Sequence, residues 1–217
     1  MLKGCLITIE GIDGTGKSSI VDMLKHRFPD AVFTAEPTQS WIGDMIKRAI
    51  ISDTDALAEL FLFTADHAEH ITKLIRPALL EGKLVISDRY SDSRYAYQGA
   101  VLSHMFEDAM EWVQSIHKGW SIVPDLTILL TIHPSIAISR LERRGNHTKF
   151  ERLKFLKKVQ ENFLKLAQNE PQRFVVVDAS QKLEKVAEDV EHAIKRFIRK
   201  HKKTSPKHIN NFNYYKG

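Results

Sequence analysis

A glycine-rich segment near the N-terminus constrains the fold more than any other feature of this sequence. Residues 11–18 read Gly-Ile-Asp-Gly-Thr-Gly-Lys-Ser and match the pattern G-x-x-x-x-G-K-S/T. An apolar run over residues 2–10 precedes the segment, and apolar residues at helical spacing follow it over residues 17–28. In a strand–loop–helix unit of this kind, successive backbone N–H groups curl around phosphate groups. The sequence therefore predicts a nucleoside triphosphate site.

The side chains of this segment have separate expected roles. Lys17 is expected to reach the β- and γ-phosphates of the nucleotide, and the hydroxyl of Ser18 is expected to bind Mg²⁺. The residues expected to contact ATP here are Gly11, Ile12, Asp13, Gly14, Thr15, Gly16, Lys17, Ser18 and Ser19.

Five apolar segments alternate with segments of helical spacing along the chain. Continuous apolar runs are typical of strands buried on both faces of a parallel sheet, so the alternation predicts a three-layer α/β domain. The expected strands are residues 2–10, 31–34, 84–87, 126–132 and 174–177. The expected helices are residues 17–28, 42–51, 106–117, 135–144, 149–167 and 183–200, with a further one from a cap at Ser52 or Asp53 to about residue 80. We expect one domain over residues 1–203 and a flexible basic tail over residues 204–217.

The charge of the chain is concentrated at one end. The net charge is +5, but eight Lys and Arg residues and no acids lie between Lys195 and the C-terminus, so the remainder carries −3. This distribution favours a solvated helix end over a nucleic-acid site. The single cysteine, Cys5, and the lack of an apolar run of about 18 residues predict a cytoplasmic protein without a membrane segment.

An Asp-Arg pair follows the third expected strand. Asp88 stands at the carboxyl end of an apolar strand, next to the glycine-rich loop in sheets of this kind, where it can help to organise Mg²⁺. Arg89 would direct a guanidinium group into the same crevice, where it suits a second phosphate. The sequence has no Asn-Lys-x-Asp motif of a guanine-specific switch.

Five motifs in a fixed order resemble the thymidylate kinase family. They are residues 11–18, Glu-Pro-Thr at 36–38, Leu-Phe-Thr-Ala-Asp at 62–66, Arg-Pro-Ala-Leu-Leu-Glu-Gly at 76–82, and Asp-Arg-Tyr-Ser-Asp-Ser-Arg-Tyr-Ala-Tyr-Gln-Gly at 88–99. The resemblance implies a P-loop kinase fold with a lid segment. It also implies transfer of the γ-phosphoryl group of ATP to dTMP, with Mg²⁺ as cofactor.

The resemblance also implies which residues bind the acceptor nucleotide. Phe63 would stack on thymine, Arg89 would hold the acceptor phosphate, and Ser93 and Gln98 would line the base site. Tyr97 would lie against the sugar, where a ribose 2′-hydroxyl would clash.

Three further residues of the motifs have implied roles. Pro37 would shape the acceptor pocket, through a cis bond between Glu36 and Pro37. Asp13 would contact the 3′ region of the deoxyribose or a metal-bound water, and it is counted with Lys17 and Arg89 among the catalytic residues.

Two positions depart from the family pattern. Ala35 and His67 stand where the family usually has Arg, and the second of those arginines commonly contacts the thymine ring. His67 could donate to the same carbonyl, and Arg94 could compensate for the missing arginine. These departures leave dUMP or another deoxynucleoside monophosphate open as the acceptor.

A basic cluster indicates the lid, at about residues 140–150. Arg140, Arg143 and Arg144 precede a Gly-Asn pair, as suits a loop that closes over ATP and excludes water. At least one of Arg143 and Arg144 should be catalytic, while Arg140 could instead pack against adenine. Glu151 joins Ser18 and Asp88 as an expected metal-site residue.

Other functions remain open from the sequence. A deoxynucleoside kinase would need a carboxylate base near the 5′-hydroxyl, and Glu36 could serve. A binding module that holds ATP without turnover is a further alternative. The resemblance implies a homodimer built on helices around residues 55–80 and 106–117.

Overall fold

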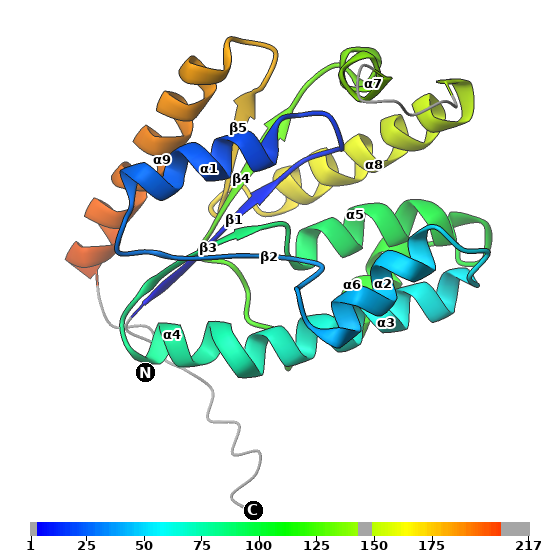
Figure 1. Ribbon diagram of the computed structural model, residues 1–217, viewed down its shortest axis with the longest axis horizontal. Helices are drawn as coiled ribbons and strands as arrows, with labels where there is room; N and C mark the ends of the chain where they lie inside the picture. Colours follow the sequence, from blue (N-terminus) through cyan, green and yellow to red (C-terminus); the bar gives the residue numbers. More distant parts are fainter. Residues whose placement is uncertain (1–3, 143–148, 205–217) are drawn as a thin grey trace, which may run out of the picture.

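Five parallel strands form the centre of the structure, a computed structural model that describes residues 4–142 and 149–204 (Figure 1). The strands are β1 (Cys5–Glu10), β2 (Val32–Ala35), β3 (Leu84–Asp88), β4 (Leu126–Thr131) and β5 (Phe174–Asp178). They pair in the order β2-β3-β1-β4-β5, and every pairing is parallel. The predicted sheet is therefore confirmed.

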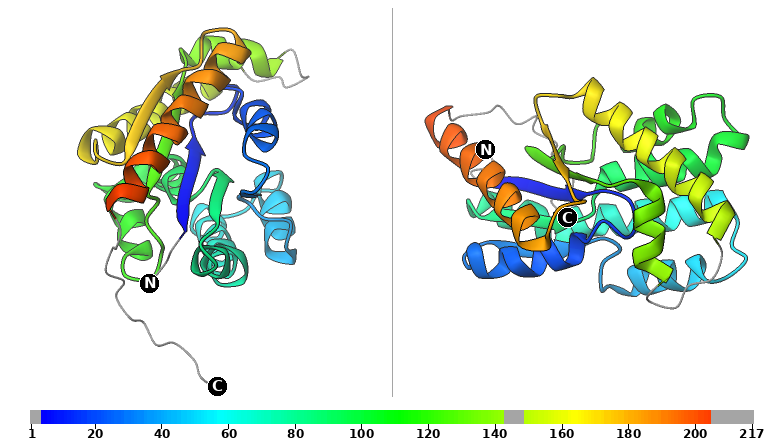
Figure 2. Two further views of the ribbon diagram at one scale, coloured as in Figure 1. Left: turned by 90° about the vertical axis from the view of Figure 1, so that its left-hand side faces the viewer. Right: turned by 90° about the horizontal axis from the view of Figure 1, so that it is seen from above.

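Helices cover both faces of this sheet (Figure 2). On one face, α1 (Lys17–Arg27) packs against α9 (Leu183–Thr204), and on the other lie α4 (Arg76–Leu80), α5 (Ser91–Val101) and α8 (Lys149–Asn169). The remaining helical elements are α2 (Trp41–Ile50), α3 (Ala56–His70), η1 (Ile71–Ile75), η2 (Leu102–His104), α6 (Ala109–His117) and α7 (Pro134–Glu142). Among the described residues, no helix combines the length and apolar character needed to cross a membrane.

The central position of β1 explains both its composition and the place of the site. β1 lies between β3 and β4, and its Leu6, Ile7 and Ile9 are fully buried. Ile9 is paired with Asp88, so the carboxyl ends of β1 and β3 lie side by side. The glycine-rich loop and Arg89 therefore begin at the same edge of the sheet.

Helix α5 was not predicted from the sequence. Its sequence is largely polar, yet Asp92, Ser93, Arg94 and Gln98 are all buried. A helix that buries polar side chains produces no apolar periodicity, which is the signal used to recognise helices.

The long helix expected to end near residue 80 is present but irregular. Its N-cap is Asp55, whose carboxylate accepts hydrogen bonds from the amides of Leu57 and Ala58, instead of the expected Ser52 or Asp53. The π-helical turn η1 then separates α3 from α4. Pro77 follows this turn, and it has no N–H to donate to the carbonyl of Lys73 in a regular α-helix.

Candidate active site

The glycine-rich loop has the backbone geometry that its sequence predicts. Gly11, Gly14 and Gly16 all have positive φ angles, of 140°, 87° and 94°. A Cβ atom at Gly14 would lie 2.4 Å from the carbonyl oxygen of Ala137, so no other residue fits there. The loop ends at Lys17, the first residue of α1, and so presents the N-terminus of this helix to a bound anion.

Lys17 is folded onto its own loop. Its Nζ donates to the carbonyl oxygen of Ile12 at 2.8 Å and lies 3.4 Å from the hydroxyl of Thr15. Burial, and then the positive charge of Arg89, lower the pKa of Lys17 from 10.5 to about 7. A phosphate group at the loop would supply a counter-charge that the chain itself does not provide in full.

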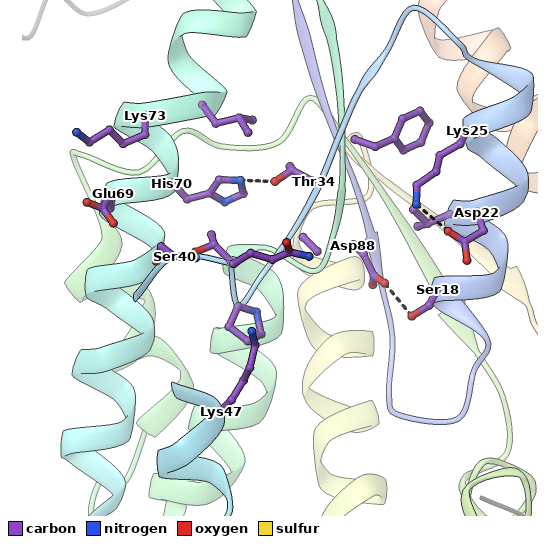
Figure 3. A pocket seen from close by; sticks show the side chains of 17 residues that line it. Ser18, Asp22, Lys25, Thr34, Ser40, Lys47, Glu69, His70, Lys73 and Asp88 are labelled. Atoms are coloured by element: carbon purple, nitrogen blue, oxygen red, sulfur yellow. Dashed lines mark hydrogen bonds and ion pairs between the residues drawn. The ribbon is translucent and has the colours of Figure 1, made fainter. Parts of the chain in front are cut away.

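Ser18 and Asp88 meet at the start of α1. The Ser18 hydroxyl donates to Oδ2 of Asp88 at 3.1 Å, and Oδ1 of Asp88 is buried without a hydrogen-bond partner among the described residues (Figure 3). A hydroxyl beside a carboxylate oxygen with free lone pairs suits a hard cation such as Mg²⁺, which keeps several waters when it binds with substrate phosphates. In the described part of the chain, no group of three or more His, Cys, Asp or Glu side chains could hold a metal on its own.

Arg89 connects the loop to a cavity that Ser93 and Tyr97 also line. Its φ angle is +65°, in the left-handed region that non-glycine residues rarely adopt. Its guanidinium donates to Oδ1 of Asp13 at 2.6 Å and to the carbonyl of Gly11 at 3.2 Å. It also donates to the hydroxyls of Ser93 at 2.9 Å and Tyr97 at 3.3 Å. Four partners fix the guanidinium at the boundary between the two parts of the site.

Glu10 holds the start of α5, next to Arg89, in place. It is not among the site residues predicted from the sequence. It is fully buried at the end of β1, and its Oε1 accepts from the amides of Tyr90 at 2.8 Å and Ser93 at 3.3 Å. Its Oε2 accepts from the Ser93 hydroxyl at 2.5 Å. Burial, together with the nearby carboxylate of Asp92, raises the pKa of Glu10 to about 8. The sequence feature that could have identified Glu10 is its position as a carboxylate at the carboxyl end of a buried strand.

Most of the residues predicted to bind the acceptor line one cavity of about 300 Å³. They are Glu36, Pro37, Phe63, Arg89, Ser93, Arg94, Tyr97 and Gln98, together with Asp13 of the loop. The bond between Glu36 and Pro37 is cis, as expected. A larger cavity of about 700 Å³ shares Pro37 with the first and includes Ser18, Asp88 and Lys47 (Figure 3). Of the residues expected to contact ATP, Asp13 lines the first cavity and Ser18 the larger one, while Lys17 and the rest of the glycine-rich loop line neither.

A buried group of four side chains, the Glu36 cluster, lies behind the wall of the acceptor cavity. Its members are Glu36, His67, His70 and Arg94, each at most 5% exposed. Oε1 of Glu36 lies 2.9 Å from Nδ1 of His67 and 2.7 Å from Nδ1 of His70, while Oε2 accepts from Arg94. Burial alone would raise the pKa of Glu36, but Arg94 and His67 outweigh it and hold that pKa well below 4.5.

Comparison with known proteins agrees with this geometry. Residues 9–190 match the family model described as thymidylate kinase. The chain belongs to the thymidylate kinase family. Relatives named "Probable thymidylate kinase" include one from Methanococcoides burtonii, 59% identical over 199 residues, which are 91% of this chain and 99% of the relative. Others come from Methanosarcina mazei, 54% identical over 204 residues (92% and 99%), and Halorubrum lacusprofundi, 47% identical over 197 residues (89% and 98%).

Family membership confirms the predicted α/β kinase fold and the predicted enzyme class, a phosphotransferase. It also confirms the reaction that the motifs implied, the ATP-dependent phosphorylation of dTMP.

His67 lies in a different place from the one predicted for it. It is fully buried and does not line the acceptor cavity. Because ionised Glu36 only accepts hydrogen bonds, Nδ1 of His67 must donate to it. Nε2, 2.8 Å from the Ser121 hydroxyl, is engaged as well. Both ring nitrogens of His67 are therefore engaged within the protein, and the side chain holds Glu36 in place.

The expected lid falls largely outside the described residues. Arg143 and Arg144 lie outside them, and Glu151 belongs to α8 but its side chain is outside the description. Arg140 lies in α7 and donates to the carbonyl oxygens of Ala179 at 3.3 Å and Gly14 at 3.4 Å. It therefore ties α7 to the glycine-rich loop. Ser19 lies in the first turn of α1.

Proposed function

We propose that the glycine-rich loop and the acceptor cavity are the donor and acceptor halves of the active site, in which Lys17 and the loop hold ATP and Arg89 holds the phosphate of dTMP. The enzyme transfers the γ-phosphoryl group of ATP to dTMP, giving ADP and dTDP. The observation that carries the site assignment is the placement of Arg89. Its guanidinium contacts Gly11 and Asp13 of the loop and also Ser93 and Tyr97 of the acceptor cavity.

The donor half works by neutralising charge. Phosphoryl transfer requires mostly positioning and electrostatic stabilisation, because negative charge builds up on the transferred oxygens. Lys17 leaves the carbonyl of Ile12 for the phosphates and becomes fully protonated there. Ser18 and Asp88 would hold Mg²⁺, the latter through water. When bound, Mg²⁺ supplies further positive charge to the phosphates.

The acceptor half orients dTMP. Phe63 provides an apolar face for the thymine ring, and Tyr97 lies where the sugar would pass toward Arg89. The phosphate of dTMP then replaces part of the contact between Arg89 and Asp13. This places the acceptor oxygen beside Asp13 of the glycine-rich loop, facing the γ-phosphate.

A deoxynucleoside kinase activity based on Glu36 is disfavoured. A general base must have a free oxygen and a pKa near the working pH. Glu36 accepts from Arg94, His67 and His70, and its pKa is well below 4.5.

We further propose that the enzyme forms a homodimer through α3 and α6. Phe61 of α3 is 53% exposed, and Met105, just before α6, is 45% exposed. Phe106 and Trp112, both partly buried, stack with their ring centroids 4.2 Å apart. Exposed apolar side chains gathered on one face are typical of an interface between subunits.

The test is a panel of nucleoside monophosphates and thymidine, assayed with ATP and Mg²⁺. The proposal expects dTMP to be the best acceptor and Arg89→Ala to lower kcat by about 100- to 1,000-fold, as the loss of a transition-state charge does. Arg199→Ala, an exposed position on α9, is the control and should leave kcat unchanged. Full turnover by Arg89→Ala, or thymidine as the better acceptor, would overturn it.

A further inference from the structure

Glu10, at the end of β1, caps a helix that lies far from it in the sequence. Tyr90, the residue before α5, makes no side-chain capping bond of its own. Oε1 of Glu10 accepts instead from the amides of Tyr90 at 2.8 Å and Ser93 at 3.3 Å, two of the N–H groups that a helix leaves unpaired at its start. These two bonds fix the carboxyl group with Oε2 directed at the Ser93 hydroxyl.

The hydroxyl of Ser93 lies between Glu10 and Arg89. Its Oγ is 2.5 Å from Oε2 of Glu10, the separation of two oxygens in a strong hydrogen bond. A hydroxyl has one proton and two lone pairs, and one lone pair of Ser93 accepts from Arg89 at 2.9 Å. What Ser93 can offer to a ligand therefore depends on whether Glu10 is ionised or protonated.

The two states of Glu10 give Ser93 opposite polarities. An ionised Glu10 only accepts, so the Ser93 proton points to it and a lone pair faces the cavity. A protonated Glu10 donates from Oε2 to Ser93, which leaves the Ser93 proton for the cavity that this residue lines. Only the protonated state provides a second donor next to the Arg89 guanidinium.

The surroundings of Glu10 favour the protonated state. The side chain is fully buried and has no ion-pair partner among the described residues. Burial and the carboxylate of Asp92 raise the pKa of Glu10 to about 8, although Arg89 and Arg94 lower it. The other charged group that interacts with Glu10 is Lys17 of α1. At pH 7 the carboxyl group is therefore mostly protonated.

We propose that Glu10 is a positioning residue for phosphoryl transfer, which as a neutral acid turns the Ser93 hydroxyl toward the phosphate of dTMP. Ser93 then donates to this phosphate beside Arg89. Ionisation of Glu10 withdraws the donor and leaves a lone pair facing the phosphate, so the enzyme binds dTMP less well at alkaline pH. The inference rests on the proposed acceptor site and adds a proton-dependent contact to it.

The experiment measures kcat and KM for dTMP between pH 7 and pH 9.5 at saturating ATP, whose phosphates keep Lys17 charged. In the wild type, kcat/KM should fall about 10-fold from pH 7 to pH 9, since a group with a pKa of about 8 is only about one tenth protonated at pH 9. The fall should appear mainly in KM, because the bond from Ser93 is made as soon as dTMP is bound.

Glu10→Gln imitates the protonated acid at every pH. Its amide oxygen can accept from the two backbone amides, and its NH₂ can donate to the Ser93 hydroxyl. This variant should retain most of the kcat/KM of the wild type at pH 7 and exceed it at pH 9, because its profile is flat. Ser93→Ala should lower kcat/KM about 10-fold at pH 7, as the loss of a hydrogen bond to a charged group does, and should also have a flat profile.

Glu188→Gln, an exposed position on α9, is the matched control and should keep the wild-type profile. The inference is overturned by a wild type without an alkaline fall, or by a fall of the same size in Glu10→Gln. A folded Glu10→Gln that is nearly inactive at pH 7 would also overturn it, since the ionised carboxylate would then be required.

If Glu10→Gln does not fold, Ser93→Ala decides the question, because a wild-type alkaline fall in that variant would exclude Ser93 as the group that responds to Glu10. A wild type that does not phosphorylate dTMP at any pH would instead overturn the proposed function, and the inference with it.

Discussion

The glycine-rich loop and the Glu36 cluster border the same cavity, but they use their polar groups in opposite ways. In the loop, Lys17 makes only local contacts with Ile12 and Thr15, and burial, together with the positive charge of Arg89, lowers its pKa more than the nearby carboxylates raise it. In the cluster, the Glu36 carboxylate accepts from three side chains, and its pKa is lowered because counter-charge is abundant.

The positive charge of Lys17 in the loop is therefore not balanced by the protein, whereas the charges of Glu36 and Arg94 in the cluster balance each other. Phosphate groups can complete the loop, whereas the cluster gains nothing from an ionic ligand. The first therefore suits electrostatic work during transfer, and the second suits the fixed placement of Arg94 beside the base.

The largest effect should come from removing the charge at the centre of the cluster. Glu36→Gln leaves the Arg94 guanidinium buried without its counter-ion, which should lower the free energy of unfolding by about 3–5 kcal/mol. The pKa of Glu36 is lower in the folded chain than in the unfolded one. The stabilisation is therefore present above the unfolded pKa and lost as the pH falls through the folded pKa.

Urea unfolding followed by circular dichroism measures this change. Glu69→Gln on α3, the helix that carries His67 and His70, is the control, because Glu69 has no ion-pair partner in the described part of the chain and should unfold as the wild type does. Equal stability of Glu36→Gln and Glu69→Gln would remove the contrast between the two regions.

At the loop, a substitution is expected to lower activity without lowering stability. Lys17→Ala should lower kcat by about 100- to 1,000-fold, since the phosphates lose a charge contact. The nucleotide-free protein should unfold at the same temperature as the wild type or higher, because a poorly solvated ammonium is gone. Steady-state kinetics and a thermal melt check both, with Lys25→Ala, an exposed position on α1, as control. A variant that is inactive because it is unfolded would contradict this expectation.

A smaller effect is expected where Tyr97 joins the glycine-rich loop to Arg89. The Tyr97 hydroxyl accepts from the amide of Asp13 at 3.0 Å and from Arg89. Tyr97→Phe removes both bonds and should cost about 1 kcal/mol, or roughly 5-fold in kcat/KM for dTMP. Kinetics at saturating ATP measure it, and a loss as large as that of Lys17→Ala would show that the hydroxyl does more than hold Arg89.

The smallest effect is a proton that accompanies nucleotide binding. Because Lys17 has a pKa of about 7, most of its population is neutral at pH 8. Phosphate groups raise this pKa, so ATP binding should take up a fraction of a proton at pH 8. Calorimetry in two buffers of different ionisation enthalpy detects the uptake. Lys17→Ala should abolish it, and identical heats in both buffers for the wild type would refute it.

The two regions also differ in how far the sequence predicts them. The loop is contiguous and its function resides in its backbone, so residues 11–18 identify it directly. The place of Arg89 follows in the same way, from its position after a buried strand. The strands were predictable because β1 and β4 are almost continuously apolar.

The Glu36 cluster could not be found by the same reasoning. Its members come from the end of β2, from α3 and from α5, and no local pattern records that three donors converge on one carboxylate. His67 was assigned to the base because its neighbours in the sequence suggested it. Helix α5 was missed because it buries polar side chains.

The left-handed backbone of Arg89 reverses an ordinary rule of protein engineering. Glycine usually weakens a structure relative to alanine, but at a φ of +65° it is the only residue without a steric penalty. Both Arg89→Gly and Arg89→Ala lose the guanidinium, but Arg89→Gly should have the higher melting temperature. A library screened at this codon for heat resistance alone would drift toward glycine, and only a demand for turnover would keep arginine there.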